Sequence, residues 1–313
     1  MNINLLRHAA YLMMALLMVA CGGSTEKQQE EEQEQPPVEQ AKSGRSLQLK
    51  DIGLASPESV TSDGTNYYVS NLGKEVLPSE KDGDGFIMQL DFEGNVLAEK
   101  FIEGLDAPKG MVILDGKLYV TDIDKVKVFS LPSGEAAGEI DFSGKGTQFL
   151  NDLAVKSPTE LFVSATDINR IYTINLADNS FDEVEVTPTI QKPNGLWYDD
   201  VNRELYVASY PNDNTGTISK VLISNRGNEY SKVNDFQGGL DGLVFLGNMI
   251  IFTDWNRSAV LLMDLGSGRV GGYPLPEGVS TIDGPADLYF DEAKGEFWIP
   301  GMRENTLTIQ TLL

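Results

Sequence analysis

The stretch GLDGLVFLGNMIIFTD, residues 239–254, contains the pattern that decides the fold. A short polar opening, Asp241-Gly242, is followed by an apolar run, the turn Gly247-Asn248 and a second run rich in Ile and Phe. Two apolar runs joined by residues that tolerate positive φ are typical of a β-hairpin.

The same plan occurs five more times along the chain. The other copies are SPESVTSDGTNYYVSN from 56, APKGMVILDGKLYVTD from 107, FLNDLAVKSPTELFVSA from 149, KPNGLWYDDVNRELYVAS from 192 and GPADLYFDEAKGEFWIP from 284. The period of roughly 40–50 residues suits about four strands per unit, as in the blade of a β-propeller. Six aromatic residues recur in register in the second strands and are predicted to pack between blades: Tyr68, Tyr119, Phe162, Tyr206, Phe252 and Trp298.

Each unit has room for two further strands. Runs such as GFIMQLDFEGN (85–95) and AVLLMDLGSGR (259–269) end in turn residues, and a more polar strand such as VLAEKFIEG (96–104) follows as the outer edge. The sixth unit stops at its third strand, NTLTIQTLL (305–313), while SLQLKDIGL (46–54) precedes the first unit. The sequence therefore predicts an all-β, six-bladed propeller over residues 46–313, four strands per blade, in which the N-terminal strand completes the last blade and closes the ring.

Residues 1–20 have the features of a secretion signal. Arg7 and His8 precede an apolar run from Ala9 to Ala20, and this run is shorter than the roughly 20 residues that span a bilayer. Its end at Ala20-Cys21 resembles a bacterial lipoprotein lipobox, so Cys21 is predicted to carry a lipid. The alternative is a plain secretion signal with an incidental cysteine.

The acidic segment at 21–45, which begins with the lipidated Cys21, is predicted to be a disordered tether, because it has no aromatic residue and little to bury. We expect the protein in the bacterial cell envelope, facing the periplasm or on the outer-membrane surface. It would contact the membrane through its lipid anchor only.

The composition restricts the possible functions. Lys and Arg total 24 against 47 Asp and Glu, a formal net charge of −23, which excludes a general basic surface for nucleic acid and suits hard cations. A single Cys excludes disulfides within the chain and Cys-ligated zinc. The only His is His8, inside the predicted signal, so carboxylate and metal chemistry must carry any catalysis outside it. We expect a monomer.

The six openings predict a binding site. The first strand of each blade lines the channel and begins on the face where the second strand ends, so the openings converge on one mouth. Alignment gives one slot per blade, occupied by Glu58, Lys109, Asn151, Asn194, Asp241 and Ala286. Glu58, Asn194 and Asp241 are oxygen donors suited to a divalent cation, Ca²⁺ first, with Mg²⁺, Mn²⁺ or Zn²⁺ as alternatives.

The loops after the second strands add residues at the rim of the mouth. These are Asn71, Asp122, Asp124, Asp167, Tyr210, Trp255 and Arg303. Tyr210 and Trp255 are candidates to stack on a sugar ring, and Arg303 to clamp an acid group. The alternative is ordinary surface, or, for Asp122, Asp124, Asp167 and Asp254, capping of neighbouring strands.

The set of openings resembles the senescence-marker-protein/gluconolactonase/luciferin-regenerating-enzyme family, also called regucalcin-like. The residues that carry the resemblance are Glu58 in SPESV, Asn151-Asp152 in FLNDLAV, Asn194-Gly195-Leu196 in KPNGLWYD and Asp241-Gly242 in GLDGLVF. It covers residues 46–313. It implies a divalent metal at the channel mouth, held by Glu58, Asn194 and Asp241, and hydrolysis of lactones or related esters. It further implies Asp241 as general base and Asn151 as the residue that orients substrate or water.

The chain departs from the family pattern at two slots. Glu58 is followed by Ser59-Val60, where many members have Gly-Pro, and Lys109 stands where a neutral residue is commoner. Lys109 would either pair with Glu58 or Asp241 and make a metal redundant, or bind a substrate carboxylate or phosphate.

Three hypotheses about function follow from these residues. The first is a metal-dependent hydrolase of lactones or related esters of sugar acids. The second is a non-catalytic lipoprotein that binds a sugar, peptide or protein at the same mouth. The third is a propeller with an organic cofactor, which no motif marks.

Overall fold

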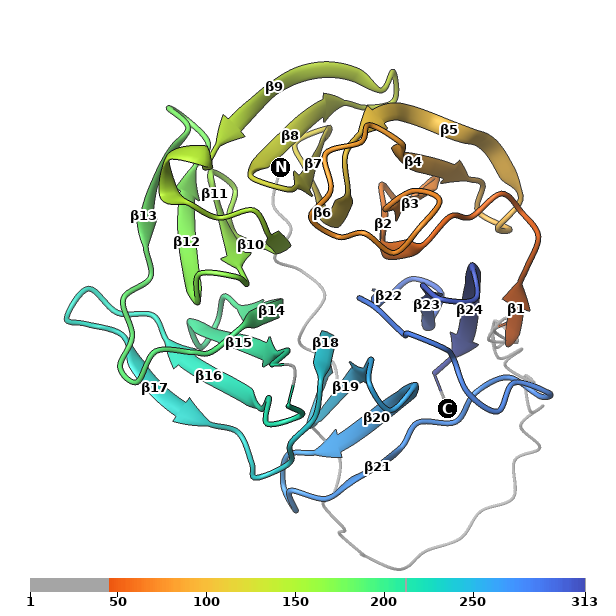
Figure 1. The fold of residues 1–313 in the computed structure, drawn as a ribbon. Helices are drawn as coiled ribbons and strands as arrows, with labels where there is room; N and C mark the ends of the chain where they lie inside the picture. Colours follow the sequence, from red (N-terminus) through yellow and green to blue (C-terminus); the bar gives the residue numbers. More distant parts are fainter. Residues whose placement is uncertain (1–44, 212, 313) are drawn as a thin grey trace, which may run out of the picture. The chain divides into compact units, whose positions relative to one another are not determined.

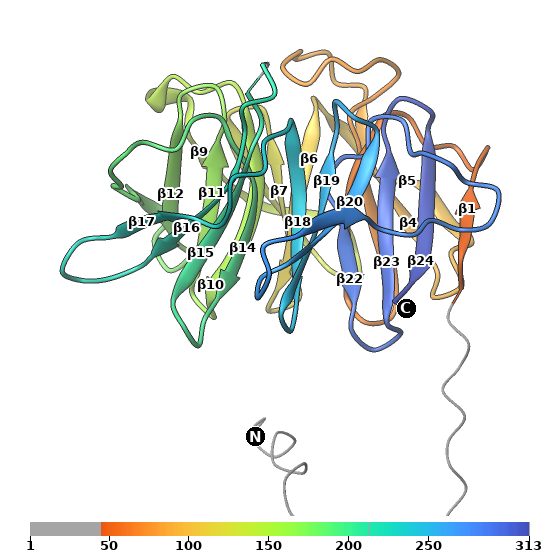
Figure 2. The same ribbon diagram turned by 90° about the horizontal axis from the view of Figure 1, so that it is seen from below.

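Residues 45–211 and 213–312 are described by a computed structural model, and their strands form six four-stranded sheets with antiparallel pairing. Figure 1 shows these sheets placed as blades around a ring, and Figure 2 shows the blades from the side. The predicted all-β, six-bladed propeller is therefore confirmed. The predicted signal, Cys21 and all of the predicted tether except Arg45 lie outside the described residues.

Each of the first five blades uses four consecutive strands, from the channel outward. Blade 1 is β2 (Pro57–Ser62), β3 (Tyr67–Asn71), β4 (Gly85–Leu90) and β5 (Val96–Leu105), and blade 2 is β6 (Pro108–Leu114), β7 (Lys117–Asp122), β8 (Lys125–Ser130) and β9 (Glu135–Asp141). Blade 3 is β10 (Leu150–Ser157), β11 (Glu160–Ala165), β12 (Arg170–Asn175) and β13 (Ser180–Glu183). Blade 4 is β14 (Pro193–Asp199), β15 (Glu204–Ser209), β16 (Ile218–Leu222) and β17 (Glu229–Lys232). Blade 5 is β18 (Leu240–Leu246), β19 (Met249–Asp254), β20 (Ala259–Asp264) and β21 (Val270–Gly272).

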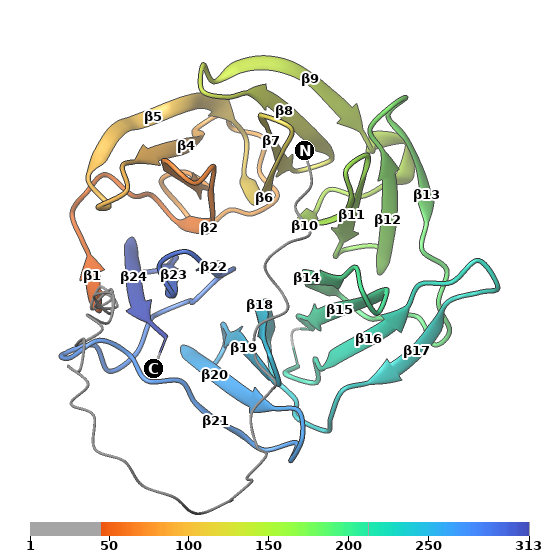
Figure 3. The ribbon, with the colours of Figure 1, turned by 180° about the vertical axis from the view of Figure 1, so that it is seen from behind.

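The sixth blade joins the two ends of the propeller. It contains β22 (Tyr289–Asp291), β23 (Glu296–Gly301), β24 (Thr306–Thr311) and, on its outer edge, β1 (Leu47–Leu49). Leu47 pairs with Ile309 and Leu49 with Leu307, and Figure 3 shows β1 beside β24 from behind. The closing strand is shorter than the predicted 46–54, because Asp51 and Gly53 have φ of 56° and 92°, values that end an extended strand.

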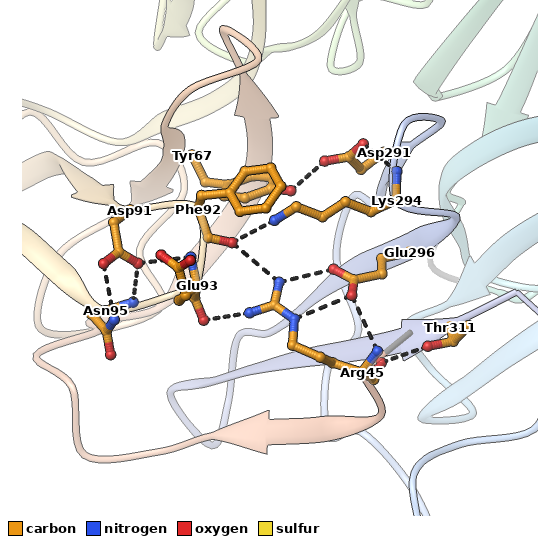
Figure 4. A network of polar contacts seen from close by, with 10 residues as sticks. All are labelled: Arg45, Tyr67, Asp91, Phe92, Glu93, Asn95, Asp291, Lys294, Glu296 and Thr311. Carbon is orange, nitrogen blue, oxygen red and sulfur yellow. Dashed lines mark hydrogen bonds and ion pairs between the residues drawn. The ribbon is translucent and has the colours of Figure 1, made fainter. Parts of the chain in front are cut away.

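Arg45 fastens this closure from just outside the predicted domain boundary. Its guanidinium contacts both carboxylate oxygens of Glu296, at 3.1 and 2.9 Å, and the backbone carbonyls of Phe92 and Glu93 in blade 1 (Figure 4). Lys294 also donates to the Phe92 carbonyl. The predicted tether included Arg45, but the structure places this residue in the ring closure.

The core lies between neighbouring blades. The six aromatic residues predicted to pack there are all buried, with exposed fractions of 0–7 %. Tyr67 of blade 1, for example, stacks on Trp298 of blade 6 with ring centroids 3.8 Å apart. Among the described residues, no helix is long and apolar enough to cross a membrane.

Replacing Arg45 with Ala should destabilise the propeller by about 1–3 kcal/mol, because the nearly buried Glu296 carboxylate loses charged hydrogen-bond donors. Urea unfolding of the full-length protein measures this change. The matched control is Arg170→Ala, which breaks an ion pair with Glu183 whose side chains are both about two-fifths exposed, and which should cost less than about 1 kcal/mol. Equal losses for the two variants would contradict the role given to Arg45.

Candidate functional site at the channel mouth

The slot residues of the first five blades lie in irregular segments of the innermost strands. In each blade the pairing between first and second strand shifts register across the slot residue and its successor. The shifts fall between Pro57 and Val60, Pro108 and Met111, Leu150 and Leu153, Pro193 and Leu196, and Leu240 and Leu243. Bulges of this kind re-aim side chains and are common near active sites. Nothing in the residue pattern of the openings predicts these bulges.

Hydroxyl groups of the second strands hold these irregular segments in place. The Ser164 hydroxyl accepts a hydrogen bond from Asp152 N at 2.9 Å and donates to the Asn194 carbonyl of the next blade at 2.8 Å. Thr253 likewise accepts from Gly242 N and donates to the Ala286 carbonyl. Each hydroxyl therefore fixes two adjacent slots at once.

Glycine after the slot allows neighbouring blades to approach closely. A Cβ on Gly195 would lie 2.2 Å from the Asp241 carbonyl oxygen, and a Cβ on Gly110 would lie 2.6 Å from the Asp152 Cα. Both contacts involve backbone atoms, which cannot move aside. The small residue in the motif Asn194-Gly195 is therefore a packing requirement of the ring.

All six slot residues are enclosed, with exposed fractions between 0 and 7 %. Glu58 of blade 1 and Asp241 of blade 5 flank blade 6, whose slot residue is the uncharged Ala286. A charge buried to this degree is unfavourable unless it is paired, neutralised or bound to a cation.

The oxygen atoms of the three predicted cation ligands are buried and free to bind an ion. Glu58 Oε2, Asn194 Oδ1 and Asp241 Oδ1 are buried, and none has a hydrogen-bond partner in the described structure. Such oxygens are the donors that Ca²⁺ prefers, so the residues present fit a divalent cation. The fit depends on the Asn194 amide. Among the described residues, no three His, Cys, Asp or Glu side chains are grouped so that they could hold a metal by themselves.

Burial and mutual repulsion raise the pKa values of the channel acids. Burial first, and then the charges of Asp241 and Asp287, raise the pKa of Glu58 well above its ordinary value, against the opposing effect of Lys109. Burial and Asp287 raise the pKa of Asp241 to about 8, an effect that the Asn194 amide opposes. These influences indicate that Glu58, Asn194 and Asp241 share one environment.

Two further carboxyl groups, Asp152 and Asp287, follow the slots of blades 3 and 6. Asp152 accepts hydrogen bonds from Leu153 N and Leu196 N, both at 2.7 Å. Asp287 accepts from Leu288 N and from the Ser59 hydroxyl, which explains Ser59 in blade 1. Burial raises the pKa of Asp287 to about 6, and burial together with Asp287 raises that of Asp152. The alignment of the slots does not predict either of them as a charged group of the site.

Lys109 is buried but forms no ion pair with Glu58 or Asp241. Its ammonium donates to the Ala107 carbonyl at 2.9 Å and lies 4.8 Å from the centre of the Phe149 ring. Burial lowers the pKa of Lys109 to about 8, while the charge of Glu58 opposes the change. The amine is therefore mainly cationic at neutral pH.

A second ring of residues, which we call the collar, lies at the mouth. Its six members each follow the last residue of a second strand: Leu72, Ile123, Thr166, Tyr210, Trp255 and Met302. Several are bonded to the first-strand openings through their backbone N–H groups, as Tyr210 N is to Lys192 O and Trp255 N to Gly239 O. Leu72, Ile123 and Met302 are almost fully buried in one apolar cluster that Trp255 joins.

Of the collar residues, the sequence analysis predicts only Tyr210 and Trp255 as part of the mouth. The signal for the other four is their equivalent position directly after each second strand. The sequence analysis also does not predict Phe149, which is half-buried beside Lys109.

Most of the polar rim residues stabilise the backbone. Asn71 Oδ1 accepts from Ala55 N, Asp122 from Asp106 N and Ala107 N, and Asp167 from Gln148 N. Asp124 pairs with Lys81, and Asp254 with Arg257. This geometry agrees with the capping alternative for Asp122 and Asp167.

The aromatic rim residues do lie together. The Tyr210 and Trp255 rings meet edge to face at 5.9 Å, and the Arg303 guanidinium lies 3.6 Å from the centre of the Trp255 ring. Arg303 is also paired with Asp283 at 3.2 Å, so its charge is already compensated.

Comparisons with known proteins support the fold. No family model matches the sequence. No curated protein matches it either. Among solved structures, a gluconolactonase from Xanthomonas campestris has a TM-score of 0.65 at 16% identity, over 86% of this chain and 90% of that one. An auxiliary nutrient binding protein from Bacteroides thetaiotaomicron has a TM-score of 0.63 at 13% identity, over 82% and 69%.

A catalytically inactive virginiamycin B lyase from Staphylococcus aureus, solved with quinupristin, has a TM-score of 0.56 at 16% identity, over 86% of this chain and 99% of that one. The propeller fold is thus shared with a gluconolactonase, a lyase and a binding protein. At these identities the likeness concerns the fold alone.

The channel acids predict a pH dependence that Asp241→Asn isolates. With a pKa raised to about 8, Asp241 keeps its proton in the folded chain at pH values where the unfolded chain releases it, above about pH 4. In the presence of a chelator, the wild type should therefore lose stability relative to Asp241→Asn as pH rises from 5 to 8. Thermal melting at several pH values measures the difference, and Glu277→Gln, an exposed acid, is the control. If the difference in melting temperature between wild type and Asp241→Asn does not change with pH, the pKa of Asp241 is not raised by burial.

Proposed function

We propose that the protein is a divalent-cation-dependent hydrolase of lactones or related esters of sugar acids. The observation that carries the proposal is the set of three buried oxygens without partners, on Glu58, Asn194 and Asp241. They belong to three different blades, and the register shifts that place Glu58, Asn194 and Asp241 leave their oxygens unused by the fold. The resemblance of the openings to the gluconolactonase-containing family supports the same reading.

In this proposal Glu58, Asn194 and Asp241 hold the cation. When bound, the ion supplies Lewis-acid polarisation of the substrate carbonyl and neutralises the repulsion between the two carboxylates. A divalent charge also favours the ionised form of Asp241, because a nearby positive charge lowers the pKa of a carboxyl group.

Asp241 acts as the general base. Water adds to the carbonyl carbon, the Asp241 carboxylate receives the proton of that water, and the ring C–O bond breaks. The departing oxygen then takes the proton, and the product is a hydroxy acid. A general base must be unprotonated before it accepts a proton, and the bound cation favours that form of Asp241.

Asn151 orients the substrate or the attacking water. Its backbone carbonyl accepts the Thr121 hydroxyl of blade 2, which fixes the residue at the channel. The Asn151 amide offers both a donor and an acceptor between Lys109 and Asn194, in the order of the blades. Tyr210 and Trp255 give the substrate an aromatic wall above the slots.

The collar favours a second candidate, a non-catalytic binding propeller with a structural ion. Leu72, Ile123 and Met302 are at most 7 % exposed and cover part of the mouth with apolar groups. A cation enclosed in this way would stabilise the ring, and ligands would contact only the rim.

The location in the cell envelope, and the lipid on Cys21, remain proposals that rest on the sequence. Nucleic acid is not expected as a partner, because the net charge is −23.

Calcium should raise the melting temperature of the full-length protein, and Asp241→Asn should remove most of this effect. At a concentration of one hundred times Kd, a ligand that binds only the folded state adds about 2.7 kcal/mol. Glu277→Gln, which changes an exposed acid, is the control and should respond to calcium as the wild type does.

Hydrolysis of a panel of aldonic lactones tests the chemistry. If Asp241 is the base, Asp241→Asn should lower kcat/KM by about 100-fold or more. Stabilisation by calcium without turnover on the panel would favour the binding propeller. Absence of both effects in the wild type would rule out the cation site.

A further inference from the structure

Among residues 45–211 and 213–312, Lys109 is the only lysine or arginine that is almost completely buried. Its ammonium has three N–H donors. One donates to the Ala107 carbonyl, and the ammonium also faces the Phe149 ring. A donor remains, and no carboxylate of the described residues forms an ion pair with it.

The nearby carboxylates are engaged elsewhere. Asp122 is paired with Lys127 at 2.8 Å and accepts two backbone N–H groups. Asp167 accepts the Thr147 hydroxyl at 2.6 Å and Gln148 N at 2.8 Å. Glu58 exerts the strongest charge effect on Lys109, but its free oxygen belongs to the proposed cation ligands.

We infer that Lys109 is a specificity-determining residue that selects ligands bearing a carboxylate, bound beside the Phe149 ring at the channel mouth. A buried cation is unfavourable until an anion pairs with it, so the ligand supplies the charge that the fold omits. A carboxylate suits the position better than a phosphate, because a second negative charge would meet Asp122 and Asp167. The inference rests on the proposed function only in assigning this ligand as a substrate of the hydrolase, one that carries a carboxylate apart from its ester carbonyl.

Arg303, the other cation predicted to bind an acid group, already has an acidic partner within the chain. Its guanidinium is bonded to Asp283 and stacked on Trp255, and its side chain is two-fifths exposed. A ligand anion at Arg303 would have to displace Asp283. An anionic ligand would therefore be stabilised more by pairing with Lys109 than with Arg303.

Calorimetry on the full-length protein tests the inference without requiring turnover. With a chelator present, so that no cation binds the carboxylate, gluconate is compared with sorbitol, which has the same six-carbon chain with a CH2OH group in place of the carboxylate. The wild type should bind gluconate and not sorbitol. Lys109→Met should weaken gluconate binding at least tenfold, and Lys109→Arg should keep part of it. Lys192→Met is the matched control, since Lys192 is a lysine of the blade 4 opening with Nζ 3.4 Å from the Asp167 carbonyl, and it should bind as the wild type does.

Folding does not obscure the result. Replacing a buried ammonium with an apolar chain of similar length should leave the melting temperature of Lys109→Met equal to or above that of the wild type. Inorganic phosphate bound more tightly than gluconate would overturn the assignment to carboxylates. Equal gluconate binding by wild type and Lys109→Met, or none by the wild type, would overturn the role of Lys109.

The two proposals fail separately. Lys109-dependent gluconate binding without hydrolysis would leave the anion site standing and reject the hydrolase. Hydrolysis of neutral lactones with full activity in Lys109→Met, and no preference for a lactone that carries a carboxylate, would do the reverse.

Discussion

The geometry of the channel depends on hydroxyl groups that bridge neighbouring blades. Ser164 and Thr253 each bond to the strand beside them and to the slot carbonyl of the next blade. A slot side chain is therefore aimed by two blades and not by its own strand alone. Displacement of one blade would misplace the ligands of the next. Arg45 joins blade 6 to blade 1 through Glu296 and the Phe92 carbonyl, so through this coupling its contacts are expected to influence the site as well.

The repeats predicted the architecture because they constrain strand number, order and the missing outer strand together. The slot residues were also found, since they occupy equivalent positions in every copy. The sequence could not reveal the register shifts around Glu58 or Asn194, because a bulge depends on how two strands pair and not on the composition of either. Arg45 was assigned to the tether because it continues a polar segment, and only its contact with Glu296 marks it as structural. The collar escaped notice because Leu72 and Ile123 look like ordinary loop residues.

The centre of the ring concentrates negative charge that the fold itself leaves unbalanced. Asp152 and Asp287 are partly compensated by backbone N–H groups, whereas Glu58 and Asp241 each keep an oxygen without a partner. Lys109 opposes this charge only in part, because its ammonium donates to the Ala107 carbonyl and forms no ion pair with either acid. Two means of compensation remain, protonation of the acids or binding of a cation. These compete, and calcium should therefore bind more weakly as the pH falls.

Fold likeness cannot choose among functions here, because gluconolactonase, lyase and binding-protein structures match at similar levels, 13–16% identity. The choice among functions has to rest on side chains whose positions do not stabilise the fold. Unpartnered oxygens on Glu58, Asn194 and Asp241, and an unpaired ammonium on Lys109, are unfavourable for folding alone. Of these residues, Glu58 in blade 1 and Lys109 in blade 2 stand on adjacent blades and carry charges of opposite sign. A ligand that contains both a carboxylate and a polarisable carbonyl would satisfy both features. Its carboxylate would pair with Lys109, and its carbonyl would face the cation proposed to bind the three oxygens. A purely structural ion would leave Lys109 unexplained, and the buried ammonium is therefore the feature that most favours a ligand in the mouth.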